Sequence, residues 1–117
     1  MSLDWSSSAL AAGLKCYGNG EFFEAHEHWE SVWLKREEPE KTFLQALIQV
    51  AAAFHHRRRG NLPGTASLLR GALNKLGGYP DEFEGIAVEE LRACLRAWLA
   101  ALERGENSPP LQVPRIL

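Results

Sequence analysis

The residues with the greatest potential for chemistry lie together in one segment, residues 21–30 (EFFEAHEHWE). The segment holds four glutamates and two histidines beside three aromatic side chains. At 3.6 residues per turn, these groups occupy about three turns of a helix. A helix that only buried an apolar stripe would not need so many titratable side chains. We therefore take this segment as the candidate functional site.

Helical periodicity divides the segment into a core face and a polar edge. His26 and Glu30, four residues apart, lie together at this edge, beside Trp33. Glu27 falls further round the helix, near Phe23 and Leu34. Large aromatic side chains on the buried faces are expected to pack in the core, and these are Phe22, Trp29, Trp33 and, near the C-terminus, Trp98.

One interpretation of the polar edge is a site for a divalent metal or a small ligand. His26 and Glu30 can chelate one ion from a single helix face, and His56 supplies a third ligand. Such a metal would activate water for hydrolysis, with Glu27 as the general base. The segment is not the strict zinc-protease motif His-Glu-x-x-His, because Glu30 stands where the second histidine belongs. This interpretation predicts a metal-dependent hydrolase.

The other interpretation is a buried hydrogen-bond network without catalysis. Gln45, Gln49 and His56 lie close to one line on the following helix, which is otherwise apolar. Buried glutamines need hydrogen-bond partners, and packing this line against His26 and Glu30 would provide them. Such a polar seam would fix the helix register of a scaffold or interaction module. Both interpretations remain open, and so does the question of whether the chain is an enzyme.

Glycine and proline divide the chain into the helical stretches that must position these groups. The third stretch is apolar almost all the way round between Phe43 and Phe54, which is typical of the middle of a bundle. No segment alternates for long enough to predict a sheet, and residues 79–85 are expected to form a loop. The sequence predicts an all-α, single-domain bundle over residues 1–117, with helices at 6–18, 21–36, 40–59, 62–77 and 88–104 and an extended, proline-rich tail at 105–117.

The charge, the apolar stretches and the cysteines of the chain indicate which partners and which cellular compartment to expect. The net charge of −2 gives no general attraction to nucleic acid or to an anionic membrane. The longest apolar-rich stretch, residues 43–54, is shorter than the roughly 20 residues of a membrane span. Cys16 and Cys94 fit reduced thiols in the cytoplasm, with a disulfide between two helices as the alternative. A homodimer is compatible with such a bundle, although no unclaimed apolar face specifies one.

The basic cluster at residues 55–59 (HHRRR) has a structural explanation. It falls at the C-terminal end of the third predicted helix, where cations complement the helix dipole. A phosphate or nucleic-acid contact is the weaker alternative, because the chain as a whole is acidic.

Several of these segments resemble one known family. The stretch FFEAHEHWE (22–30) with Trp33, the helix FLQALIQVAAA (43–53) and the turn Arg59-Gly60-Asn61 resemble the domain of unknown function 309 family. The stretch at 64–69 is also similar, with Thr65 where the family pattern suggests alanine. The resemblance covers about residues 14–76 and implies a helical bundle around one central helix. Some such proteins are called metal-dependent hydrolases, which would make His26, Glu27 and Glu30 site residues.

Overall fold

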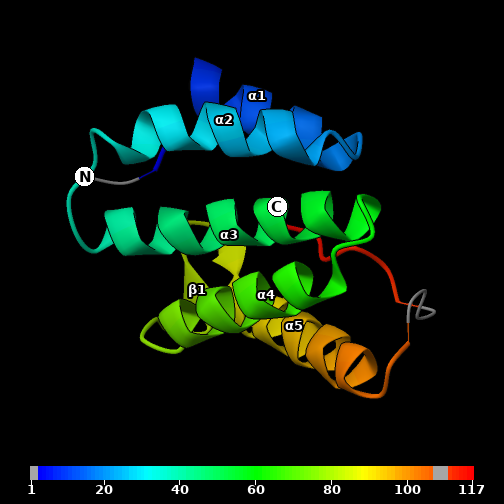
Figure 1. Ribbon diagram of the computed structural model, residues 1–117. Coiled ribbons are helices and arrows are strands. Elements are labelled where there is room, and N and C mark those ends of the chain that lie inside the picture. Colours follow the sequence, from blue (N-terminus) through cyan, green and yellow to red (C-terminus); the bar gives the residue numbers. More distant parts are fainter. Residues whose placement is uncertain (1–2, 107–110) are drawn as a thin grey trace.

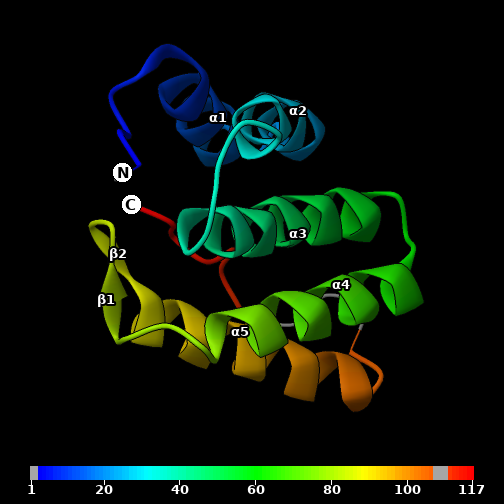
Figure 2. The same ribbon diagram turned by 90° about the vertical axis from the view of Figure 1, so that its left-hand side faces the viewer.

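The helices lie in three tiers. The computed structural model describes residues 3–106 and 111–117 of the chain. Figure 1 shows α1 (Ser8–Gly18) and α2 (Phe22–Trp33) above α3 (Glu40–Arg58), with α4 (Leu62–Leu76) and α5 (Val88–Glu103) below it. Figure 2, turned by 90°, shows the same three tiers. The all-α fold with a central third helix is therefore confirmed.

The middle tier holds the core because α3 is apolar around most of its circumference. α3 packs against α2 of the upper tier and α4 of the lower tier. Its side chains with no exposed surface are Phe43, Leu44, Ala46, Leu47, Val50, Ala51 and Ala53. At the other end of α3, the Phe54 ring lies 5.1 Å from the ring of Trp98 on α5. Burying a large apolar side chain contributes about 1.5–3 kcal/mol. These contacts hold the upper and lower tiers to one shared helix.

Local sequence signals set the ends of the helices. Asn61 caps α4, because its Oδ1 accepts a hydrogen bond from the backbone N–H of Gly64 at 3.0 Å. Gly20 and Gly60 both have positive φ, which stops the preceding helix and turns the chain. α2 ends at Trp33, three residues before the expected end at residue 36. The loop that follows leads to Pro39, next to the start of α3.

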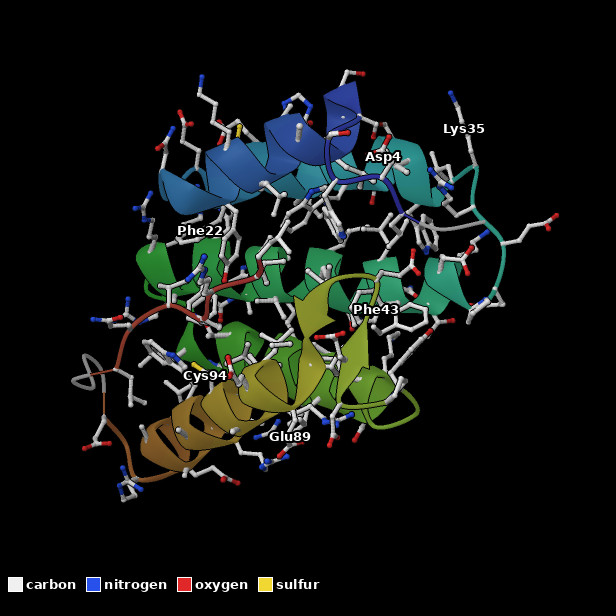
Figure 3. All side chains as sticks on the ribbon, turned by 180° about the vertical axis from the view of Figure 1, so that it is seen from behind. Asp4, Phe22, Lys35, Phe43, Glu89 and Cys94 are labelled. Carbon is white, nitrogen blue, oxygen red and sulfur yellow. The ribbon has the colours of Figure 1, made fainter. Side chains whose placement is uncertain are left out.

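A short hairpin corrects the expectation of a loop without strands. β1 (Glu82–Phe83) and β2 (Ile86–Ala87) pair antiparallel. Glu84 and Gly85 form the turn with φ of 52° and 79°, as a two-residue hairpin turn requires. The Phe83 ring lies 4.8 Å from Phe43 on α3, and Figure 3 shows Phe43 beside the hairpin. The hairpin therefore covers one side of the α3 core.

The described part of the C-terminal tail packs back on the bundle. Residues 111–117 have no regular secondary structure, and Pro109 and Pro110 lie outside the described residues. The hydroxyl of Tyr17 donates to Pro114 O at 2.7 Å, and Trp98 Nε1 donates to Gln112 O at 2.9 Å. Burial raises the pKa of Tyr17 well above its ordinary value, so the hydroxyl stays protonated as a donor. The tail thereby joins α1 and α5.

The structure also bears on the pairing of the two cysteines and on membrane-spanning helices. Cys16 and Cys94 are both free and partly buried, so they do not form the alternative disulfide. Burial raises the pKa of both thiols. Among the described residues, no helix has the length and apolar character needed to cross a membrane.

Candidate functional site

α2 presents its polar residues because three other side chains fix its orientation. Phe22, Ala25 and Trp29 are buried at helical spacing, and they turn one face of α2 toward α1 and α3. The Trp29 indole, which is fully buried, donates from Nε1 to Leu10 O at 3.3 Å. Phe22 and Trp29 are therefore core residues, as predicted, and Glu24, Glu27 and Glu30 of the same helix are exposed.

The polar edge of α2 contains one close pair. His26 Nε2 lies 3.5 Å from Glu30 Oε2, with side chains 26% and 50% exposed. A pair four residues apart on an exposed helix face contributes only about 0.3–0.5 kcal/mol. The other ring nitrogen of His26, Nδ1, is buried and has no hydrogen-bond partner in the described residues. The pair predicted from the sequence is present, but it is not a buried network.

The third predicted metal ligand has a different local partner. His56 Nδ1 lies 3.3 Å from Asn61 Nδ2, the residue that caps α4. No group of three His, Cys, Asp or Glu side chains within residues 3–106 and 111–117 is placed to hold a metal ion. Protein zinc sites use at least three such ligands, so the side chains of this surface do not fit a resident metal. Glu27, the predicted general base, is exposed on α2.

The two glutamines do not join α2. A Cβ added at Gly71 of α4 would lie 3.3 Å from Gln49 Oε1, so the Gln49 side chain packs against α4. Gln49 Oε1 is buried without a hydrogen-bond partner in the described residues. Neither Gln45 nor Gln49 bonds to His26 or Glu30, both of which are described, so the predicted polar seam is not formed. α3 has a neighbour on each side, and Gln49 faces α4.

Trp33 is only partly buried, although we expected it in the core. Lys41 Nζ of α3 lies 4.9 Å from the centre of its ring, in a cation–π arrangement. At the opposite end of α2, the Phe23 ring lies 5.2 Å from His55 and 5.9 Å from His26. These contacts place the polar edge of α2 along α3, with aromatic contacts at both ends.

The outward side of α2 carries a stripe that the sequence analysis did not identify as a site. Phe23 of α2 and Leu34, the residue that follows its last turn, are 45% and 66% exposed. They lie eleven residues apart, close to one line along the helix. Glu27 and Glu30 lie between them on the same line and are exposed. We call Phe23, Glu27, Glu30 and Leu34 the α2 stripe. The spacing of four, three and four residues between these positions is the sequence signal that could have identified the stripe.

The pKa of His55, whose ring contacts Phe23 of the stripe, is shifted by burial and by neighbouring charges. Burial lowers the pKa of His55 from its ordinary value, and the positive charges of Arg59 and His56 lower it further. The carboxylate of Glu24 acts in the opposite direction. His55 is therefore held toward its neutral form next to the exposed Phe23 ring.

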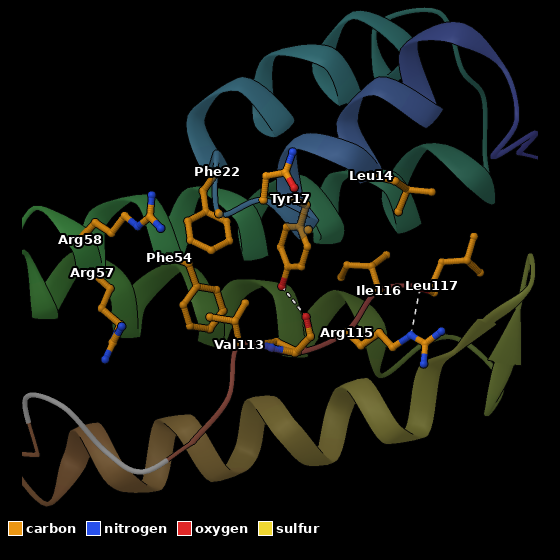
Figure 4. A pocket seen from close by; sticks show the side chains of 14 residues that line it. Leu14, Tyr17, Phe22, Phe54, Arg57, Arg58, Val113, Arg115, Ile116 and Leu117 are labelled. Carbon is orange, nitrogen blue, oxygen red and sulfur yellow. Dashed lines mark hydrogen bonds between the residues drawn. The ribbon is translucent and has the colours of Figure 1, made fainter.

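A cleft lies away from this stripe, beside the C-terminal tail. It has a volume of about 580 Å³ and apolar walls from Leu14, Tyr17, Phe22 and Phe54. Figure 4 shows these side chains with three arginines, Arg57, Arg58 and Arg115, around the same space. The walls of this cleft come from three separate parts of the chain, so local sequence patterns do not predict it.

The chain matches one family model and is similar to a protein of Aquifex aeolicus. A family model described as "Domain of unknown function (DUF309)" matches residues 10–68. The chain is also similar to an "Uncharacterized protein" of Aquifex aeolicus (strain VF5), with 38% identity over 98 residues. The match covers 82% of this chain and 29% of the relative. The chain therefore spans less than a third of the length of that relative.

Proposed function

For this chain, which belongs to the DUF309 family, we propose a non-catalytic interaction module that docks a helical partner along the α2 stripe. The observation that carries the proposal is the arrangement of the stripe itself. Phe23 and Leu34 expose apolar surface at its two ends, and Glu27 and Glu30 lie between them. A helix that lies along another helix is held by anchors at this kind of spacing.

The charge of α2 specifies the chemistry of the partner. Residues 22–33 contain three glutamates and no lysine or arginine. The complementary partner is a helix with apolar side chains at both ends of one stripe and lysine or arginine between them. Opposite charges would fix the register, and the apolar ends would supply most of the buried surface.

The length of the Aquifex aeolicus relative supports a modular role. In the Aquifex aeolicus protein the matching region is one part of a much longer chain. A domain that forms only part of a longer relative is expected to act together with other protein segments. The two free cysteines support a reducing compartment, and we propose the cytoplasm.

A metal-dependent hydrolase is the weaker candidate on chemical grounds. Its three predicted ligands were His26, Glu30 and His56. His26 lies beside Glu30 and His56 beside Asn61, and the described residues hold no group of three such ligands. The proposed module uses Glu30 differently, as a surface charge beside Glu27.

A synthetic helical peptide tests the proposal. It carries leucine at both ends of one stripe and two lysines between, and a second peptide has glutamate in place of lysine. Isothermal titration calorimetry should give binding of the lysine peptide that weakens as salt is raised, because exposed charges are screened. The glutamate peptide should bind at least about tenfold more weakly.

Two matched protein variants locate the binding. Glu27→Lys should weaken the lysine peptide about tenfold, whereas Glu24→Lys makes the same charge change on α2 but outside the stripe and should have a much smaller effect. Equal losses in the two variants, or equal affinity for the two peptides, would contradict docking along the stripe.

A further inference from the structure

The cleft beside the C-terminal tail has a cationic end and an apolar end. Figure 4 shows Arg57 and Arg58 toward one end, and Leu14 and Ile116 toward the other. Its volume of about 580 Å³ is in the range of sites that hold one small molecule. The shape and the lining are those of a site for an amphipathic ligand.

The two arginines at the cationic end lie against aromatic rings and have no carboxylate partner among the described residues. The guanidinium carbon of Arg57 lies 4.8 Å from the centre of the Trp98 ring, and that of Arg58 lies 5.1 Å from Phe22. Within residues 3–106 and 111–117, neither arginine forms an ion pair. Both positive charges are therefore available to an anion.

The Nε of Arg57, which is unpaired among the described residues, is a second feature that favours a bound anion. This atom is buried and has no hydrogen-bond acceptor in the described part of the chain. A buried N–H without an acceptor is costly, and a ligand oxygen would satisfy it. Guanidinium groups bind carboxylates through paired, charge-assisted hydrogen bonds.

The remaining arginine of the cleft is already engaged. Arg115 Nε donates a hydrogen bond to Leu117 O at 3.1 Å, drawn as a dashed line in Figure 4. The other lining side chains toward that end are apolar and include Leu14 and Ile116. This part of the cleft suits a hydrocarbon chain.

We propose that this cleft binds a single-chain carboxylate amphiphile, such as a free acyl carboxylate. The carboxylate lies at the end of the cleft that Arg57 and Arg58 line, and the chain extends past Tyr17 toward Leu14 and Ile116. The site is separate from the α2 stripe, and it does not depend on the function proposed for that stripe.

Calorimetric titration with dodecanoate, kept below the concentration at which it forms micelles, tests this assignment. Dodecanoate should bind, and affinity should fall by up to about fourfold for each CH₂ removed in decanoate and octanoate. Dodecanol, which has the same chain without the charge, should bind about tenfold more weakly, and dodecyl phosphate should bind no more tightly than dodecanoate.

Variants connect the binding to the cationic end. Arg58→Gln should weaken dodecanoate about tenfold, since a hydrogen-bonded charge is lost. Arg57→Gln should do the same, and it provides a second measurement if one variant folds poorly. Arg59→Gln is the matched control, because Arg59 is the next exposed arginine and does not line the cleft.

Three results would overturn the assignment. They are no dodecanoate binding to the unaltered chain, equal affinity for dodecanol, and equal losses in Arg58→Gln and Arg59→Gln. Tighter binding of dodecyl phosphate than of dodecanoate would overturn the carboxylate head group and show that the cleft selects a phosphate instead.

Discussion

The Trp29 indole occupies the space where Gly13 lacks a side chain. A Cβ added at Gly13 would lie 2.8 Å from Trp29 Cε2 and would also collide with Cδ1 and Nε1. Gly13 lies within α1 and is buried, so α1 comes this close to α2 only because the residue is glycine. This contact sets the orientation of α2 and therefore the direction in which the α2 stripe faces.

The first prediction follows from that contact. Gly13→Ala should reduce the free energy of unfolding by about 1–3 kcal/mol, because the clash outweighs the better helix propensity of alanine. Gly18→Ala, near the end of the same helix with nothing within 4 Å of its added Cβ, is the control and should cause no loss. Denaturant unfolding measures both, and equal stabilities would contradict the close packing.

A second prediction concerns the pair on the polar edge. His26→Ala should cost less than about 1 kcal/mol of unfolding free energy, because Glu30 is 50% exposed and keeps its water contacts. Trp29→Ala, on the buried face of the same helix, should cost about 3–5 kcal/mol. A loss from His26→Ala as large as that from Trp29→Ala would instead indicate a buried network around His26.

A third prediction follows from the lowered pKa of His55. Its folded-state pKa lies below the unfolded value of about 6.5, so the unfolded chain binds more protons as the pH falls through that region. This part of the stability is present above about pH 6.5 and is lost on acidification. The melting temperature of His55→Gln should therefore fall less than that of the unaltered chain between about pH 7.5 and pH 5.5. Parallel falls would contradict the prediction.

Much of the fold could be predicted from the sequence, because its signals are local. Glycine and asparagine at the helix ends act within a few residues, as at Asn61, and the apolar circumference of α3 identified the central helix. The hairpin at residues 82–87 was missed because strands of two residues are too short to show alternation. The turn at Glu84 and Gly85 was the available signal.

The arrangement of the polar residues could be predicted only in part. A helical wheel shows which side chains share a face, so the pairing of His26 with Glu30 followed from their spacing. The wheel does not show which neighbour that face meets, and Gln49 packs against Gly71 of α4 rather than against α2. The cleft depends on the path of residues 113–117, which local periodicity does not specify.

Docking along the α2 stripe is tested most directly by a charge swap. The double variant Glu27→Lys with Glu30→Lys is titrated with the lysine peptide and with the glutamate peptide. The account predicts that the variant binds the lysine peptide at least about tenfold more weakly than the unaltered chain does, and binds the glutamate peptide correspondingly more tightly. Unchanged affinity for the lysine peptide, without any gain for the glutamate peptide, would contradict it.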